Sequence, residues 1–462
     1  EEEIGAGALE VMVYHNPEHA AKTIETMKPA PMANTLGFMK PVTCAKILSL
    51  VDLSALSLAL DRIPPDLVAM ILENMEGKKS QIIMQGMSPK TMAFTLEVLI
   101  NGDAWKKAAG WLQGMHESVI SAALLEIEPP VGATCLEKLD AVTSSGTAAR
   151  VLENMDSVLP KCASRVVENM SAFSAAHLLA QVDSQVGARC LQQLEPSMVP
   201  KVLNSMKPGL AAKLLMMVDL LTIRISAVKA MSVEQASQLL NETPAPEVAK
   251  VIGGMEPDAA ARIVSRMDPA KATFALERMD AGSAANVAKH LGDEKLTGIL
   301  EKVWLQHAVR FVEELQVSRV WKILKNMDHK CGTRLLDTIP ADTMVKLIQG
   351  MEDAEMKLVL GTLRLIQPAP LVKAIPQMTD ETVLRVLMHV SPVVAVAVLQ
   401  KIDLTRSPKA FAKAIEAMDP QKAMKMLEKL EYKIASFVIT DMAPEKTAPL
   451  LNNMDPVYVS RC

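Results

Sequence analysis

Aromatic residues are scarce in this chain, and long apolar runs and an excess of either charge are also missing. Phenylalanine, tryptophan and tyrosine make up 3% of the 462 residues, although half of the chain is hydrophobic. The core must therefore be filled by aliphatic side chains and by methionine, which occurs 31 times. Such a composition favours packed helices over sheets.

The cysteines form no CxxC pair and no metal-ligand pattern. A secreted domain stapled by disulfides would be shorter and richer in cysteine. We therefore expect reduced thiols in an intracellular reducing compartment, either the cytoplasm or an organelle stroma or matrix, with a plastid among the candidates. The six residues are Cys44, Cys135, Cys162, Cys190, Cys331 and Cys462.

The net charge of -4 provides no strongly basic face, so we expect no nucleic-acid partner. No apolar run reaches the roughly 18–20 residues that are needed to span a bilayer. No signal peptide is visible, and the sequence starts with three glutamates instead of methionine. We therefore expect a processed or trimmed chain, and removal of a transit peptide would fit.

A twelve-residue period runs through the sequence. Starting at Met27, the same kind of residue recurs 35 times, and 28 of the 34 intervals are twelve residues long. We call this recurring residue the reference position; it is apolar in 34 cases and methionine in 18. Apolar residues also recur seven, four and three residues before it, which is the stripe of one helix face.

The same period encodes the helix ends. Asp or Glu follows the reference position in 17 cases, and Pro stands one residue later in 14. An acidic side chain caps free backbone amides, and Pro fits the first turn of a helix. Each unit is thus predicted to be one short helix, too short to persist alone, so that the helices must stack.

Six intervals depart from twelve residues, and five of them are 15 or 16 residues long. Such an insertion adds one helical turn and keeps the apolar stripe facing the core. The segment Ser391–Leu399 looks like a strand in isolation but is in phase with the helical period. We therefore predict that it is helical.

We predict an all-α fold, an α-solenoid of about 35 short helices in which two units make a 24-residue hairpin. Residues 1–462 are expected to form a single continuous array. Small residues usually lie six positions before the reference position, but large ones predominate there from Val309 to Val396. We expect a change of curvature around residues 300–400.

Units such as Met255–Met267 (MEPDAAARIVSRM) and Met418–Leu430 (MDPQKAMKMLEKL) resemble the helical repeats of the cytosolic N-terminal domain of MgtE-type magnesium transporters. The middle part of the flagellar switch protein FliG is similar. The resemblance implies an α-superhelix of short helices joined by acidic-Pro turns. It also implies, as an alternative function, a module that responds to magnesium or another ligand.

Catalytic and metal-binding patterns are weak. His15 and His19 have a spacing that could bind a metal, but Pro17 lies between them, so we expect a solvated helix start. Cys44, Cys135 and Cys190 are expected in the core, and the methionines at the reference position are expected to fill it. Gly5-Ala-Gly7 follows no strand and is no phosphate loop. We expect no enzyme, no cofactor and no metal site.

One exposed column is strongly biased. Five residues before the reference position, 17 of 35 residues are Lys or Arg and none is acidic, whereas the column two residues before it is acidic in 13 cases and basic in four. The basic residues either pair with acidic caps of neighbouring units or form a basic stripe for an acidic protein. Our candidate partner-binding residues are Arg150, Arg165, Arg189, Lys213, Arg262, Arg310, Arg334, Lys346 and Arg385.

The leading hypothesis is a non-enzymatic scaffold or linker that holds proteins with acidic surfaces in a multi-subunit assembly, since solenoids offer extended binding surfaces. An organellar assembly, such as a photosynthetic or respiratory complex, is a more specific form of it. Exposed aromatic residues would mark the binding surface. The ones to inspect are Trp105, Trp111, Trp304, Trp321, Tyr14, Tyr432 and Tyr458.

Overall fold

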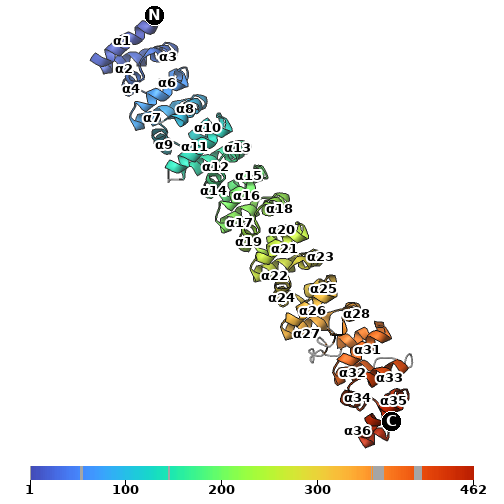
Figure 1. Cartoon of the computed structure of the whole chain (residues 1–462). Helices are drawn as coiled ribbons and strands as arrows, with labels where there is room; N and C mark the ends of the chain where they lie inside the picture. The colour runs from blue at the N-terminus through green and yellow to red at the C-terminus, as the bar shows by residue number, and fades with distance from the viewer. Residues whose placement is uncertain are drawn as a thin grey trace. The chain divides into compact units, whose positions relative to one another are not determined.

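In a computed structural model, the chain folds into short α-helices joined by tight turns (Figure 1). The structure describes residues 2–52, 56–102, 104–143, 146–354, 356, 360, 369–399 and 408–461. Within these residues there are 36 α-helices and one short 3₁₀ helix but no strand, so the predicted all-α solenoid is confirmed. The helices belong to two compact units, Glu1–Thr243 and Pro244–Cys462.

Unit 1 contains helices α1 to α19. They are α1 Glu2–His15, α2 Pro17–Thr26, α3 Pro29–Phe38, α4 Pro41–Leu48, α5 Ser57–Leu60, α6 Pro65–Glu73, α7 Gly77–Gly86, α8 Pro89–Asn101, α9 Trp105–Gln113, α10 Glu117–Leu125, α11 Pro129–Val142, α12 Thr147–Val158, α13 Pro160–Glu168, α14 Ala172–Leu179, α15 Ser184–Gln193, α16 Val199–Asn204, α17 Pro208–Met217, α18 Leu221–Ala230 and α19 Val233–Glu242.

Unit 2 contains the remaining helices. They are α20 Ala245–Gly253, α21 Pro257–Arg266, α22 Pro269–Arg278, α23 Ala281–His290, α24 Asp293–Leu300, α25 Leu305–Glu314, α26 Val317–Asn326, α27 His329–Thr338, α28 Ala341–Gln349, α30 Ala369–Ala374, η2 Ile375–Gln377, α31 Asp380–His389, α32 Pro392–Leu399, α33 Pro408–Ala417, α34 Pro420–Leu427, α35 Tyr432–Thr440, α36 Pro444–Asn453 and α37 Pro456–Val459.

The helix starts follow the predicted capping chemistry. Asp419 caps α34 by accepting a hydrogen bond from the amide of Lys422, and Pro420 occupies the first turn. Asp268 and Pro269 play the same parts at the start of α22. The acid satisfies an amide that the helix leaves unpaired, and the proline has none to leave unpaired.

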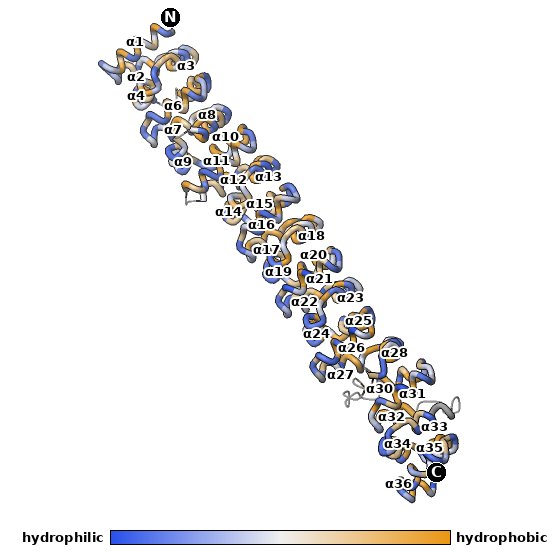
Figure 2. Tube along the Cα trace, in the orientation of Figure 1, coloured by the Kyte–Doolittle hydropathy of each residue, from blue (hydrophilic) through white to orange (hydrophobic). Residues whose placement is uncertain are grey.

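In most of the described repeats, the reference position lies at or just after a helix end, and most of these side chains are buried. Met267 terminates α21 with an extended backbone (φ -67°, ψ 159°), and its side chain is only 2% exposed. Met39, Leu291 and Met351 are buried in the same way, so these methionines fill the core as predicted. Figure 2 shows the resulting alternation of apolar and polar residues along the helices of each unit.

Helices that are two apart in the chain pack side by side. In unit 2, α20 packs on α22, α22 on α24 and α24 on α26, while α21, α23, α25 and α27 pack in a parallel series. From α20 to α27, unit 2 therefore has one layer of even-numbered and one layer of odd-numbered helices. Small residues six positions before the reference position, such as Ala261 and Ala285, are buried between neighbours.

The longer repeats lengthen helices, as predicted. The extra residues before Met115, Met155 and Met170 extend the preceding helices α8, α11 and α12 past the reference positions Leu99, Leu139 and Met155. These three helices have 13, 14 and 12 residues, against ten in α21 or α22. The two other insertions of this size fall on segments outside the described residues. The strand-like segment near Ser391 is helix α32, Pro392–Leu399.

The two compact units divide the chain at Thr243. The single continuous array over residues 1–462 stays a prediction, and so does the change of curvature around residues 300–400. In that region large side chains do occupy the column that is usually small: Trp321 is 5% exposed, and Val345 and Leu360 are each 8% exposed.

At ten places among the described residues, a recurring hydrogen bond connects one helix end with the turn after the second helix that follows. The acceptor is the acidic residue two positions before one reference position. The donor is the backbone amide directly after the reference position two units later in the chain. Glu277, at the end of α22, accepts from the amide of Trp304, which follows α24. The same bond joins the pairs Glu10–Lys40, Glu25–Asp52, Asp61–Ser88, Glu137–Ser171, Glu153–Asp183, Glu168–Glu195, Glu301–Asp328, Glu416–Ala443 and Glu428–Asp455.

Candidate protein-interaction surface

The column five residues before the reference position lies at the centre of each helix's outward face. On α21, Arg262 is exposed, whereas Ala260, Ala261, Ile263 and Val264 around it are buried. With 100° between successive residues, the four buried positions form one arc, and the fifth points away from it. We call this the outward column.

All nine predicted partner-binding residues lie on this column. Eight are exposed, and Arg385 is half-buried. In unit 1, Arg165, Arg189 and Lys213 lie on α13, α15 and α17, which pack in succession, and Arg150 lies on α12 in the other layer. In unit 2, odd-numbered helices carry all the candidates except Lys346 on α28. The structure therefore does not bring the nine onto one face.

Three of the nine pair with acidic residues of other repeats. Arg150 binds Glu117, the first residue of α10, and Arg189 binds Asp156. The guanidinium of Arg385 lies 2.7 Å from the carboxylate of Asp353. Glu117 has a pKa below its ordinary value, first because of a backbone hydrogen bond and then because of the bond from Arg150. These three thus pair with acids of neighbouring units, but none of the acids is seen to cap a described helix: Glu117 follows the N-cap His116, and Asp156 lies inside α12.

The other six have different surroundings. Arg262 pairs with Asp258 at 3.4 Å, and Arg310 pairs with Glu313 at 3.0 Å, each within its own helix. The remaining four form no ion pair within 4 Å with any residue that the structure describes. They are Arg165, Lys213, Arg334 and Lys346.

Sequence reasoning missed a second set of basic residues, eight positions before the reference position. The ammonium of Lys295 on α24 donates a 2.6 Å hydrogen bond to the carbonyl of Met267, which ends α21. The guanidinium of Arg319 on α26 binds the carbonyl of Leu291 in the same way and the carboxylate of Asp293 at 2.7 Å. Such residues neutralise the negative C-terminal end of a neighbouring helix, so they serve the fold.

The cysteines show no reactive environment in the described residues. Cys44, Cys135 and Cys190 are buried, and burial is the main cause that raises the pKa of each thiol to about 12. Cys162 and Cys331 are partly buried, and burial raises their pKa as well. Cys462 lies outside the described residues. The predicted core role of the first three is confirmed.

The histidine pair and the glycine pair lie where the sequence placed them. His15 ends α1, and Asn16 caps α2 by accepting a hydrogen bond from the amide of His19, so the pair straddles an exposed turn. Gly5 and Gly7 lie inside α1. In the described part of the chain, no group of three or more His, Cys, Asp or Glu residues is arranged to hold a metal ion.

The aromatic residues divide into core and surface. Trp105, Trp111 and Trp321 are at most 7% exposed, whereas Trp304 is 61% exposed. The hydroxyl of Tyr458 donates to the carbonyl of Leu430. Tyr14 and Tyr432 are exposed, at 87% and 48%. Trp304 is therefore the one tryptophan on the described surface.

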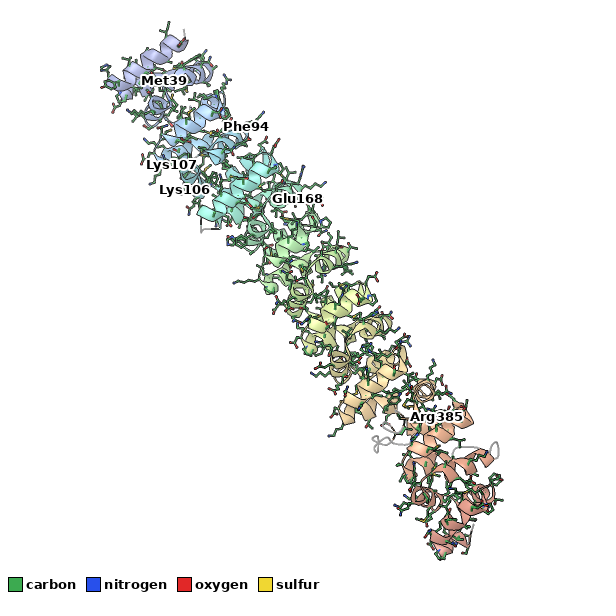
Figure 3. The ribbon with its side chains drawn as sticks, viewed as in Figure 1. Met39, Phe94, Lys106, Lys107, Glu168 and Arg385 are labelled. Atoms are coloured by element: carbon green, nitrogen blue, oxygen red, sulfur yellow. The ribbon has the colours of Figure 1, made fainter. Side chains whose placement is uncertain are left out.

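Large apolar residues also occupy the outward column. Sequence reasoning missed them because it considered only the basic residues of that column. Four consecutive helices of unit 1, α5 to α8, carry Leu58, Met70, Ile82 and Phe94 there, each 43% exposed or more. Figure 3 labels Phe94 on α8. In unit 2, Phe274 on α22 is 53% exposed. Apolar residues opposite the core do not stabilise the fold, so they indicate contact surfaces.

Comparison with known proteins finds one family match, and it covers a limited stretch of the chain. Residues 224–304 match the MgtE intracellular N domain. This MgtE-N stretch includes the unit that starts at Met255, one of the two that carry the resemblance in the sequence. No curated protein matches the chain significantly. The described residues contain no helix that is both long and apolar enough to cross a membrane.

Among solved structures, the chain is similar to three helical proteins at low sequence identity. An engineered protein from a structural genomics consortium is 14% identical, with 92% of this chain and 98% of that chain covered and a TM-score of 0.23. The condensin Cnd3-Cnd2 subcomplex of S. pombe is 12% identical, with 99% and 92% covered and a TM-score of 0.22. APUM23 with the RNA GGAAUUGACGG is 12% identical, with 98% and 95% covered and a TM-score of 0.19. These scores carry no inference on function.

Proposed function

We propose that this chain is a non-enzymatic scaffold or linker that binds other proteins through the outward faces of its helices. Arg165, Lys213, Arg334 and Lys346 carry the proposal. These residues point away from the core and are exposed, and they form no ion pair with the described residues. A helix gains little from a lone charge at the centre of its outward face. Acidic surfaces on partner proteins would pair with them.

Affinity capture from native extract, followed by cross-linking and mass spectrometry, tests this function. The tagged full chain is compared with a variant in which all four residues are changed to Glu. We expect a defined set of partners that the variant loses by tenfold or more. Recovery of the free chain alone, from the wild type, would overturn the scaffold function.

A matched control separates the outward column from charge in general. The control variant reverses four exposed lysines that lie outside that column and form no ion pair with a described residue. They are Lys28, Lys78, Lys106 and Lys161. It carries the same change of net charge, so equal loss of partners in both variants would contradict a specific role of the column.

A second candidate function rests on the MgtE-N match at residues 224–304. It is a regulatory module that changes conformation when magnesium or another small ligand binds. It predicts a saturable magnesium response in the full chain, read from the melting temperature and from small-angle scattering.

The setting of the scaffold belongs to the same proposal. A multi-subunit assembly predicts that the native chain migrates in a complex much larger than its 50.1 kDa in size-exclusion chromatography of cell extract. An organellar setting, such as a plastid, predicts that the complex is found in the stroma or matrix fraction. Subcellular fractionation with an antibody against the chain measures both.

A further inference from the structure

The even-numbered helices of unit 2 present a continuous outward surface. α20, α22, α24 and α26 pack one on the next, and their outward columns hold Lys250, Phe274, Gly298 and Lys322. Because every second helix runs in the same direction, these four residues lie at the same height across the layer. The spacing between packed helices is about 8–10 Å.

Gly298 is an unusual residue at the middle of this surface. It lies inside α24, and a Cβ atom placed on it would meet no heavy atom within 4 Å. Glycine is unfavourable in a helix interior, and here no close neighbour requires it. It does leave an open notch, where another backbone or a bulky side chain can approach the helix closely.

Two exposed aromatic residues come from the segments next to Gly298, one on the neighbouring helix α22 and one in the turn after α24. Phe274 on the neighbouring helix α22 is 53% exposed. Trp304, at the turn between α24 and α25, is 61% exposed, and its amide donates a 3.0 Å hydrogen bond to Glu277 at the end of α22. Its ring makes an edge-to-face contact with His307 of α25. In a chain that is only 3% aromatic, exposed Phe and Trp at one place indicate a binding surface.

The basic residues on this surface are available to a partner. Arg278, Lys302, Lys322 and Lys325 are exposed and form no hydrogen bond or ion pair with any described residue. By contrast, Lys295 and Arg319 on the same helices are bound to backbone carbonyls of neighbouring helices. Among nearby acids, Glu277 and Glu301 accept amide hydrogen bonds, whereas Glu294, one turn before Gly298 on α24, is exposed. Lys250 pairs with Glu247 of its own helix at 2.8 Å.

A hollow of about 480 Å³ adjoins the surface between α20 and α22. Ala249, Gly253 and Met279 line it, together with the basic residues Lys250 and Arg278. Pro246, Asp280 and Ser283 complete its lining, and the Asp280 carboxylate is occupied by the amides of Gly282 and Ser283.

We propose that this surface binds an acidic segment of a partner protein that also carries apolar side chains. We call it the α20–α26 face; it consists of Lys250, Phe274, Arg278, Gly298, Lys302, Trp304, Lys322 and Lys325. Carboxylates of the segment pair with the free basic residues, and its apolar side chains lie in the notch at Gly298 and in the hollow. The inference rests on the proposed scaffold function and specifies where one partner binds.

An acidic protein segment fits this face better than a nucleic acid does. Charges further than about a Debye length, 8–10 Å, are screened, so the local basic residues attract either anion and the apolar features must decide between them. An acidic peptide carries less charge, and its apolar side chains match the notch and the hollow.

Fluorescence anisotropy with the full chain tests the face. The probe is a fluorescein-labelled 16-residue peptide of four Glu-Glu-Leu-Glu repeats, compared with the same peptide with Gln in place of Glu and with a labelled 16-nucleotide poly(U) RNA. We expect saturable binding of the acidic peptide alone. K322E/K325E and G298L are each expected to weaken it at least tenfold.

Two matched variants serve as controls. G110L changes a glycine of α9 that also lies on the outward column with nothing within 4 Å. K78E/K106E reverses two exposed lysines on α7 and α9, which pack side by side; Figure 3 labels Lys106. Both variants should bind the peptide like the wild type. Because G298L removes a helix glycine without a clash, its melting temperature should equal or exceed that of the wild type, so that lost binding does not reflect unfolding.

Three outcomes would overturn the inference. They are absence of acidic-peptide binding, unchanged binding by both K322E/K325E and G298L, and tighter binding of poly(U) that the same variants abolish. Affinity capture from native extract would distinguish failure of the α20–α26 face from failure of the scaffold function. If native extract still yields partners that survive K322E/K325E, the scaffold stands and the α20–α26 face does not.

Discussion

The guanidinium of Arg189 on α15 binds the carboxylate of Asp156, whose side chain is only 1% exposed at the end of α12. Both the Nε and Nη2 atoms of Arg189 donate to one carboxylate oxygen, and the other oxygen is buried without a partner among the described residues. Asp156 also contributes, after burial, to raising the pKa of the neighbouring Cys190 thiol. Arg189 therefore stabilises the fold, although it lies on the outward column.

Removing Arg189 should destabilise unit 1 measurably. R189A leaves the buried Asp156 carboxylate without its counter-charge, and we expect a loss of about 2–3 kcal/mol, below the range for fully buried pairs because Arg189 is half exposed. R165A, which alters an exposed residue of the same column without an ion pair, should lie within about 0.5 kcal/mol of the wild type. Urea unfolding followed by circular dichroism measures both. Equal midpoints for the two variants would contradict the structural role of Arg189.

The hydrogen bond from Trp304 to Glu277 should protect the turn after α24. E277A leaves the amide of Trp304 without its acceptor and should destabilise the chain by about 1–2 kcal/mol, whereas E277Q retains an acceptor oxygen. Hydrogen exchange with mass spectrometry should show faster exchange around Trp304 in E277A alone. E97A, at a position of the same column with no such bond among the described residues, is the control. Unchanged exchange at Trp304 in E277A would show that the bond contributes little.

The sequence predicts the fold well because one interaction pattern repeats. The recurring apolar residue, such as Met267, predicts a buried helix end, and the acidic residue and Pro after it predict the next helix start. Both features depend only on residues that are close together in the chain. The bond between Glu277 and Trp304 joins residues 27 positions apart. The excess of acidic residues two positions before the reference position indicates that these side chains have a role. The donor to Glu277 cannot be predicted from the sequence, because every residue type except proline has a backbone amide.

The candidate surface was less predictable. The basic bias of the outward column is visible in the sequence, but Arg189 and Lys213 have the same signature although the first is bound to Asp156 and the second has no ion pair. Distinguishing them requires knowledge of which acids lie across the layer. Gly298 is recognisable as a binding feature only once its empty surroundings are known.

The buried thiols should resist alkylation at neutral pH. A pKa of about 12 leaves on the order of one thiolate in ten thousand for Cys44, Cys135 and Cys190 at pH 8. Iodoacetamide followed by mass spectrometry should label Cys162 and Cys331 first, and the other three only on unfolding. Rapid labelling of Cys190 in the native chain would contradict its placement.

The same thiols make stability depend on alkaline pH. The unfolded thiols ionise near pH 9, below the folded value of about 12, so their contribution to stability is fully present below pH 9 and is lost as pH rises from 9 towards 12. Urea midpoints measured from pH 7 to pH 11 should fall above pH 9. Replacing Cys44 by Ala should reduce this slope, and an unchanged slope would mean that its thiol titrates normally.

Magnesium should change the melting temperature of the chain no more than another divalent cation does. No metal-holding group of three or more His, Cys, Asp or Glu residues lies in the described part of the chain, so we expect screening of surface charge alone. Differential scanning fluorimetry in increasing MgCl₂, with CaCl₂ and NaCl at equal ionic strength as controls, measures this. A saturable shift specific to magnesium would favour the regulatory module over the scaffold.

Glycine on the outward column should lower stability wherever it occurs. Gly110 on α9 and Gly298 on α24 both lie inside helices, and a Cβ atom would meet nothing within 4 Å at either. G110A and G298A should each stabilise the chain by about 0.5–1 kcal/mol, since Ala restricts the unfolded chain more and fits a helix better. Gly187 is the contrast, because its Cβ would come within 3.0 Å of a Leu214 methyl group, so G187A should destabilise. Urea midpoints of the three variants measure the effect. If G298A were destabilising while G110A was not, the fold of α24 itself would require Gly298. The glycine would then be explained without a binding partner.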